Sequence, residues 1–243
     1  MIGTEYNPVT GQVEIVDHGE FNPADYGEIF EDWRARLNTG EGWNWGPTAV
    51  GTTWAVSLPN ATAGIQGILR QQITHSAAGT ATHIYSLGAT QNLSLTGGRI
   101  VIDARVRPEA ATTNVTEREY WLGLMSNTTI LPTHGVFIGF AGLGSPNWQG
   151  RSVVSSVATT STSTVAAVQN NTWTTLRIEI NETATSADFF VNNVSIATLS
   201  LPGTVRGMFP AFYMRSVSTA AATAYGVNQD FYRLRQYFTT PRI

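Results

Sequence analysis

The sequence predicts an all-β protein, a two-layer antiparallel jelly-roll sandwich with one short N-terminal helix. From residue 48 onward, apolar and polar residues alternate in short runs, such as TTLRIEI at 174–180, and this alternation places successive side chains on opposite faces of a sheet. About eleven such runs are bounded by Gly, Pro, Asn or Ser clusters, with no helical pattern between them. No fixed-period repeat is present, which argues against a propeller or a solenoid. Short strands of this kind are typical of a closed or double-layer antiparallel architecture.

The length of 243 residues is enough for one large hydrophobic core. We therefore expect one main domain over residues 27–243 and an N-terminal extension over residues 1–26. Within the extension, Val13 to Val16 form a short extended run between turn-forming Pro and Gly residues. Two interpretations of this run remain open: a strand added to the main sheet, or an arm that contacts a neighbouring subunit.

The short helix is expected where the main domain begins. In NPADYGEIFEDWRARLN, the residues Ile29, Phe30, Trp33 and Leu37 recur at spacings of three and four, which is the spacing of one helical face. Asp25 precedes them and could cap the first turn.

Composition excludes several classes of function. The net charge is −3, and the 14 cationic side chains include no lysine, so a nucleic-acid partner is not expected. Cysteine is absent, which excludes disulfides, thiolate metal sites and a cysteine nucleophile. No run approaches the roughly 18 apolar residues of a membrane span, and no secretory signal is present. We therefore expect a protein that is not inserted into a membrane and is made in the cytoplasm of its host.

The hairpin over residues 172–196 contains one informative exception to its alternation. Along the second strand, Phe189 belongs to a buried row, whereas Phe190 projects with Asp188 and Asn192 onto the opposite face. Phe190 either packs against a loop or a neighbouring subunit, or forms an aromatic platform in a ligand groove.

Loop tryptophans supply the other candidate binding residues. Trp43 and Trp45 lie in GEGWNWGPT, and Trp148 follows Asn147 in GSPNWQG, where Gly and Pro indicate loops. Such tryptophans can close the ends of the sandwich, anchor a protein interface or stack on sugar rings. These four residues and Phe190 are the candidates for an interface or a carbohydrate site.

Acidic residues do not form the pattern of a sandwich glycanase. A retaining glycanase needs two carboxylates roughly 5 Å apart on one face, which a Glu-x-Asp-x-Glu strand would supply. No such strand is present, and Glu179 and Glu182 would face opposite ways. Glu117 and Glu119 share a side, but an arginine between them and their position at a strand entrance favour a solvated edge. We therefore expect no catalytic residue and no enzymatic activity.

Histidines do not assemble a metal site in the sequence. A hairpin turning near Gly79 would place His75 opposite His83, but two histidines need a third ligand and none is apparent. The expectation is no metal and no cofactor.

The stretches NNTWTTLRIEIN and ADFFVNNVSIATLSLP resemble a hairpin of the concanavalin A-like lectin and glucanase sandwiches, which include laminin-G-like modules. The closing AYGVNQDFYRLRQYF is similar to the final strand of that fold. The resemblance covers most of residues 27–243 and implies a tight turn at Asn192 and Asn193. Its motifs recur in members of unrelated function, so it implies a fold and no activity, and no metal-binding residues are carried over.

Low charge and abundant Thr, Ser, Asn and Ala favour a virion protein. We expect a non-catalytic bacteriophage capsid decoration (cement) or head-fibre protein on the capsid or tail surface, with the major capsid protein as a partner. A homo-oligomer is expected, preferably a trimer, because capsid decorations commonly sit on threefold axes. The first alternative is a glycan-binding adhesin module of a phage tail receptor-binding protein. The second is a glycoside hydrolase or lyase without the usual acidic motif.

Overall fold

The chain folds into two antiparallel β-sheets that pack face to face, which confirms the predicted sandwich. The computed structural model describes residues 2–7, 12–17, 26–31, 45–50, 54–57, 68–87, 93–110, 113–127, 132–142, 146–161, 166–201 and 207–239. In this part of the chain no segment is long and apolar enough to cross a membrane as a helix.

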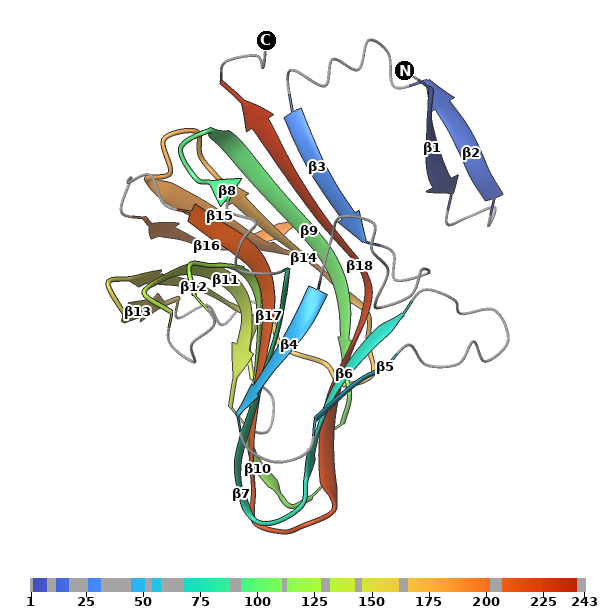
Figure 1. Cartoon of the computed structure of the whole chain (residues 1–243), viewed down its shortest axis with the longest axis vertical. Helices are drawn as coiled ribbons and strands as arrows, with labels where there is room; N and C mark the ends of the chain where they lie inside the picture. The colour runs from blue at the N-terminus through green and yellow to red at the C-terminus, as the bar shows by residue number, and fades with distance from the viewer. Residues whose placement is uncertain are drawn as a thin grey trace.

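The first sheet, here called the β10 sheet, has the strand order β13-β12-β11-β10-β17-β7-β4, and β8 pairs with β17 at one end. Figure 1 shows these strands curving through the molecule. Their bounds are β4 Trp45–Val50, β7 Gly79–Leu87, β8 Leu93–Ser94, β10 Val115–Met125, β11 His134–Ala141, β12 Gln149–Val154, β13 Val157–Thr160 and β17 Gly207–Ser218.

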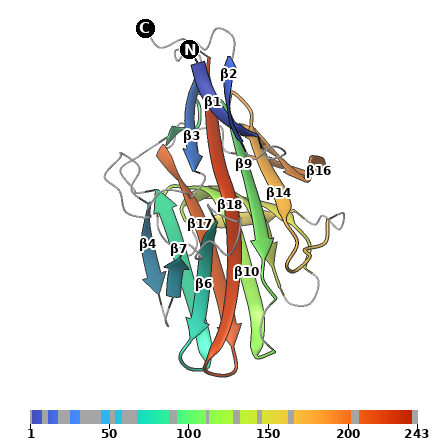
Figure 2. The ribbon, with the colours of Figure 1, turned by 90° about the vertical axis from the view of Figure 1, so that its right-hand side faces the viewer.

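The second sheet, here called the β9 sheet, has the order β16-β15-β14-β9-β18-β6-β5, and β3 pairs with β18. Figure 2 shows β6, β18, β9 and β14 side by side in this layer. Their bounds are β3 Tyr26–Glu31, β5 Trp54–Ser57, β6 Leu69–His75, β9 Gly98–Pro108, β14 Thr174–Ile180, β15 Ser186–Val191, β16 Val194–Ser200 and β18 Thr223–Phe238.

The core lies between the two sheets and follows the alternation of the sequence. Leu176, Ile178 and Ile180 of β14 are fully buried, and they belong to the same cluster as Tyr120 and Leu122 of β10. The intervening residues of β14 are only partly buried, because successive side chains point to opposite faces of the sheet. The predicted hairpin is also present: Ile178 pairs with Phe189 across β14 and β15.

The predicted helix is wrong over the residues that the structure describes there. Residues 26–31 form β3, which pairs antiparallel with β18 from Tyr26 opposite Tyr237 to Glu31 opposite Tyr232. The edge of a long strand offers backbone partners to the whole segment, and this pairing outweighs a weak local helical pattern. Trp33 and Leu37 lie outside the described residues, and the described part of the chain contains no helix.

The N-terminal extension contains a hairpin of its own. Strands β1 (Ile2–Asn7) and β2 (Gln12–Asp17) pair antiparallel in a two-stranded sheet, and β2 includes the extended run at Val13 to Val16. Neither strand joins a sandwich sheet among the described pairings. The boundary at residues 26 and 27 and the role of the arm stay predictions.

Two turns connect the layers at the lower end of the molecule in Figure 1, where β6 leads into β7 and β17 leads into β18. The expected pairing of His75 with His83 is wrong for this reason: the chain passes from one sheet to the other between them. His75 lies opposite Thr223 of β18, and His83 lies opposite Met214 of β17.

Candidate functional site

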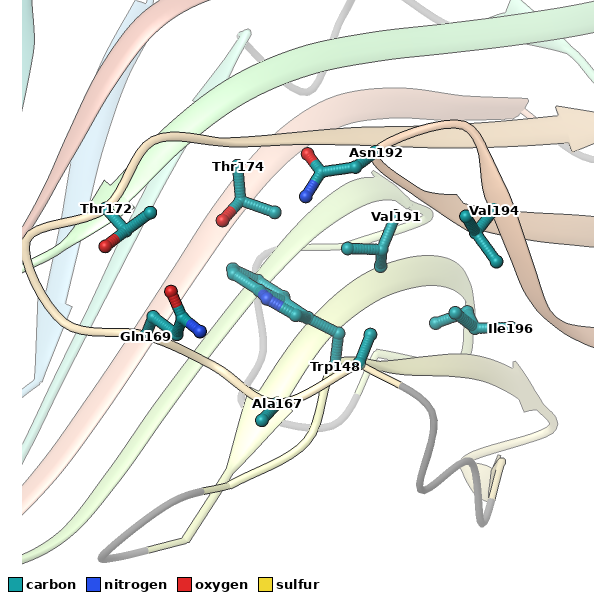
Figure 3. A pocket seen from close by; sticks show the side chains of 10 residues that line it. Trp148, Ala167, Gln169, Thr172, Thr174, Val191, Asn192, Val194 and Ile196 are labelled. Atoms are coloured by element: carbon teal, nitrogen blue, oxygen red, sulfur yellow. The ribbon is translucent and has the colours of Figure 1, made fainter.

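A pocket of about 260 Å³ opens beside the β15–β16 turn, and Trp148 forms its floor (Figure 3). Its walls come from the segment before β14 and from the end of β15 with the start of β16. We call it the Trp148 pocket and define it by its ten lining residues: Trp148, Ala166, Ala167, Gln169, Thr172, Thr174, Val191, Asn192, Val194 and Ile196.

Local backbone pairing holds Trp148 in this floor. The N–H of Trp148 donates to the carbonyl of Ala166 at 2.8 Å, and the N–H of Val168 donates to the carbonyl of Pro146 at 2.7 Å. Between them, Asn147 and Ala167 form an antiparallel β-bridge. The segment that carries the indole is thus hydrogen-bonded to residues 166–168, which form the adjoining wall.

The indole of Trp148 also belongs to the core. Only 1% of its surface is exposed, and its ring meets the ring of Phe140 edge-on at 5.2 Å with an interplanar angle of 84°. Edge-on contacts are a favoured arrangement of aromatic rings. The orientation of the indole is therefore set before any ligand arrives.

The β15–β16 turn positions the polar side chain of Asn192. Asn192 and Asn193 have φ values of 49° and 65°, a left-handed conformation that asparagine tolerates and that two-residue hairpin turns require. The side-chain oxygen of Asn192 accepts a hydrogen bond from the N–H of Thr175 at 3.0 Å. This bond fixes the carboxamide, so its nitrogen lies on the side of the pocket (Figure 3).

The pocket has one apolar wall and one polar wall. Val191, Val194 and Ile196 lie together on one side, and Gln169, Thr172 and Thr174 lie toward the other (Figure 3). None of the ten lining residues is charged. An uncharged site disfavours an ionic ligand, because burying a charge without a counter-ion costs free energy.

The charge-free character extends beyond the pocket itself. Residues 152–176 and 189–205 contain no Asp, Glu, Lys, Arg or His. These two stretches are far apart along the chain, but both supply lining residues to the Trp148 pocket. This was the signal in the sequence that could have indicated a neutral binding site and the residues that complete it.

The five residues predicted from the sequence as interface or carbohydrate-site candidates do not all lie at the pocket. Trp148 forms the floor of the pocket, and Asn147 fastens the adjoining wall. Phe190 is half-buried on the outer face of the β9 sheet, opposite Arg177 and Ser195, and does not line the pocket. Trp45 is the first residue of β4, and Trp43 lies outside the described residues.

A second cluster lies on the outer face of the β10 sheet. Arg215 of β17 donates from one nitrogen to Glu117 at 3.0 Å and to Glu119 at 3.4 Å, so the two carboxylates share a face and a cation. Next to them, the guanidinium of Arg151 lies 3.8 Å from the ring centroid of Trp121. This outer face is therefore polar at one end and aromatic further along.

Burial changes the acid–base properties of this outer face. Desolvation lowers the pKa of Arg151, while the nearby Glu119 carboxylate opposes the change. Desolvation raises the pKa of the Tyr213 hydroxyl, and the charge of Glu119 adds to the effect. Tyr213 therefore stays a neutral hydrogen-bonding group at ordinary pH.

The position of β11 opposite Trp121 has room only for glycine. Gly139 of β11 pairs directly with Trp121, and a Cβ atom at Gly139 would lie 1.9 Å from the carbonyl oxygen of Tyr120. The backbones of β10 and β11 approach too closely there for any side chain.

Among the described residues, no three His, Cys, Asp or Glu side chains lie close enough together to bind a metal ion.

No protein-family model matches the sequence, and no curated protein matches it. Solved structures do match the fold. The carbohydrate recognition domain of Emp47p superimposes with a TM-score of 0.55 at 8% identity, over 89% of this chain and 99% of that one. The β-glucanase of Bacillus licheniformis gives a TM-score of 0.54 at 13% identity, over 86% of this chain and 97% of that one.

A further match is the GlcNAcα1-4Gal-releasing endo-β-galactosidase of Clostridium perfringens, with a TM-score of 0.57 at 11% identity, over 90% of this chain and 65% of that one. The chain has the concanavalin A-like sandwich fold. The likenesses show this fold alone and do not test the expected bacteriophage origin.

The expectation that the protein is not an enzyme is wrong, because a concanavalin A-like sandwich can be an enzyme. A β-glucanase and an endo-β-galactosidase share the fold. The expectation rested on the missing Glu-x-Asp-x-Glu strand, yet Glu117 and Glu119 meet on one face without that motif. At 13% and 11% identity, the two enzymes assign no reaction to this chain.

Proposed function

We propose that the protein binds carbohydrate and that the Trp148 pocket holds a neutral sugar ring. The observation that carries the proposal is an uncharged pocket that lies over the buried Trp148 and has one aliphatic wall and one wall of hydroxyl and amide groups. A pyranose ring has the same division, since its C–H groups form apolar patches and its hydroxyls both donate and accept hydrogen bonds. Pockets with apolar surfaces and a few fixed polar groups are the usual form of a small-molecule site.

The fold supports the proposal without deciding it. One of the matching structures is described as a carbohydrate recognition domain, and two are enzymes that act on glycans. The support specific to this chain is the fastening of both walls, through the Asn147–Ala167 bridge and the Asn192–Thr175 hydrogen bond. Walls that are ordered in advance reduce the entropy lost when a small ligand binds.

The test is a titration of the isotopically labelled full chain with neutral mono- and oligosaccharides, followed by amide and indole NMR shifts. We expect shifts at Trp148 and within residues 166–174 and 191–196. Val194→Arg should abolish them, because Val194 is a lining residue that is 57% exposed. Ser195→Arg is the matched control, since Ser195 is an exposed neighbour outside the lining and its variant should bind normally.

Two results would contradict the proposal. One is the absence of shifts with every neutral sugar. The other is a set of shifts confined to the outer face of the β10 sheet, with the response unchanged in Val194→Arg.

Glycoside hydrolysis is the second candidate function, and the geometry of Glu117 and Glu119 favours it. Both carboxylates reach the same nitrogen of Arg215, and two carboxylates on one face are the minimum for a glycosidase. We expect release of reducing sugar from a suitable polysaccharide to fall at least 100-fold in Glu117→Gln and in Glu119→Gln. Glu182→Gln, an exposed change elsewhere, should have no effect.

A place on a bacteriophage particle stays a prediction, as do the trimer and the contact with a major capsid protein. Low charge and a surface rich in Thr, Ser and Asn are what favour it. Analytical ultracentrifugation of the full chain and of a chain lacking residues 1–26 would test the assembly. A trimer that persists without these residues would remove the arm from the proposal.

A further inference from the structure

The Trp148 pocket carries a fixed hydrogen-bond donor next to an aliphatic wall, and this pair of features identifies a class of sugar. We propose that the pocket selects a 2-acetamido sugar and that Asn192 determines this specificity. The inference rests on the proposed carbohydrate binding and deepens it. An acetamido group has a carbonyl that needs a donor and a methyl group that needs apolar contact.

The donor is the side-chain nitrogen of Asn192. The backbone N–H of Thr175 requires an oxygen acceptor, and the Asn192 side chain supplies it at 3.0 Å. The orientation of the carboxamide is therefore determined by a hydrogen bond, and the NH₂ group is the end that faces the pocket (Figure 3). An NH₂ group can donate to a carbonyl oxygen and cannot accept from an amine.

The aliphatic wall stands beside this donor. Val191 precedes Asn192 in the chain and is buried, while Val194 and Ile196 follow the turn on the same side of the pocket (Figure 3). Val194 is 57% exposed, and among the large hydrophobic side chains that the structure describes only Val157 is more exposed. A methyl group placed against this wall would cover apolar surface that is otherwise in contact with water.

The volume of the pocket and its uncharged lining restrict the class of ligand further. A volume of about 260 Å³ lies just below the usual range of small-molecule pockets and suits one ring better than an extended chain. The ten described lining residues include no cation to pair with the carboxylate of an acidic sugar and no anion to pair with a free amino sugar. The acetamido form is neutral, so it meets no such cost.

The test compares three closely related ligands on the full chain: N-acetylglucosamine, glucose and protonated glucosamine. Affinities are measured from NMR shifts of residues 166–174 and 191–196. We expect N-acetylglucosamine to bind at least tenfold more tightly than glucose, and glucosamine to bind more weakly than both. Equal affinity for N-acetylglucosamine and glucose would overturn the acetamido inference and leave the proposed function standing, whereas no response to either sugar would overturn both.

Asn192→Asp tests the donor itself. Aspartate tolerates the left-handed backbone and still offers an oxygen to the N–H of Thr175, but it replaces the NH₂ group with a second acceptor. We expect the preference for N-acetylglucosamine over glucose to disappear. Asn193→Asp is the matched control, since it makes the same charge change in the same turn at a residue outside the lining, and it should keep the preference. A preference that survives Asn192→Asp, or that both variants lose equally, would overturn the role of Asn192.

Discussion

Two hydrogen bonds join Asn192 to Thr175: the Asn192 side-chain oxygen accepts from the Thr175 N–H at 3.0 Å, and the Asn192 N–H donates to the Thr175 carbonyl at 2.8 Å. The pair ties the β15–β16 turn to the start of β14. A single residue thus closes the turn, fastens it to the neighbouring strand and presents its amide nitrogen to the Trp148 pocket (Figure 3).

The stability of this turn should depend on the identity of residue 192. Asn192→Gly keeps the left-handed backbone and loses the side-chain bond, so we expect a loss of about 1 kcal/mol in the free energy of unfolding. Asn192→Ala loses the same bond and, unlike asparagine or glycine, disfavours the left-handed conformation, so it should cost about 1 kcal/mol more than Asn192→Gly. Urea denaturation of the two variants measures the difference. A glycine variant less stable than the alanine variant would contradict the account.

Arg118 should contribute strongly to stability because it is buried between the sheets. Only 2% of its surface is exposed, and one of its nitrogens donates to the Glu109 carbonyl at 3.2 Å and to the Asn170 side chain at 2.7 Å. Its guanidinium lies within 6 Å of the rings of Phe140 and Tyr225, at 5.6 and 5.7 Å. We expect Arg118→Ala to cost about 3 kcal/mol through lost packing and unpaired acceptors.

Arg118→Met separates the two contributions, because methionine restores much of the volume and none of the hydrogen bonds. The methionine variant should be more stable than the alanine variant in urea denaturation and less stable than the unchanged protein. Equal stability of both variants would show that packing contributes little at this position.

Gly139 should not accept a side chain. The added Cβ of Gly139→Ala would lie 1.9 Å from a backbone carbonyl oxygen, and β10 and β11 would have to separate. We expect a loss of several kcal/mol, seen as a lower midpoint of thermal unfolding. Gly97→Ala is the comparison: its Cβ would meet the end of the Gln236 side chain at 2.7 Å, and a side chain can rotate away. A smaller loss at Gly139 than at Gly97 would contradict the argument.

The free energy of unfolding should decrease as the pH is lowered, because His83 is buried. Burial lowers the pKa of His83 to about 4, whereas the unfolded chain has a histidine pKa of about 6.5. Unfolding therefore takes up a proton between these values, so this contribution is complete above about pH 6.5 and is lost as the pH falls toward about 4. The full difference corresponds to about 3 kcal/mol.

His83→Gln is neutral throughout this range and should flatten the dependence of unfolding free energy on pH between about 4 and 6.5. The measurement is urea denaturation at several pH values. Burial also lowers the pKa of His75, so a smaller slope of the same sign should remain. An unchanged slope in the variant would show that His83 is not the group responsible.

Sequence patterns predicted the features of this fold that depend on near neighbours. The alternation in residues 174–180 fixes the inner and outer faces of β14, and the two asparagines of the β15–β16 turn adopt positive φ, as such turns require. The prediction of a short helix was wrong because residues 26–31 pair with β18, which lies about two hundred positions away in the chain. The predicted pairing of His75 with His83 was wrong for a similar reason. The short connection near Gly79 joins the two sheets, so β6 and β7 do not form a hairpin.

The pocket could be predicted only in part. A tryptophan in a Gly- and Pro-rich loop indicated Trp148, but its partners come from residues 166–174 and 191–196, which only the fold brings together. Asn192 was recognisable as a turn residue from its sequence context. Its second role depends on the hydrogen bond from Thr175, which aims the amide.

The left-handed backbone at residue 192 restricts how this protein can diversify. Only asparagine, aspartate and glycine are readily accommodated there. During evolution the side-chain amide can therefore be kept, replaced by the carboxylate acceptor of aspartate, or removed by glycine. Gln169 and Thr172 lie outside regular strands and carry no such restriction. If the Trp148 pocket binds sugar as proposed, homologues with a different sugar preference should therefore differ mainly at residues 169 and 172, and residue 192 should be asparagine, aspartate or glycine.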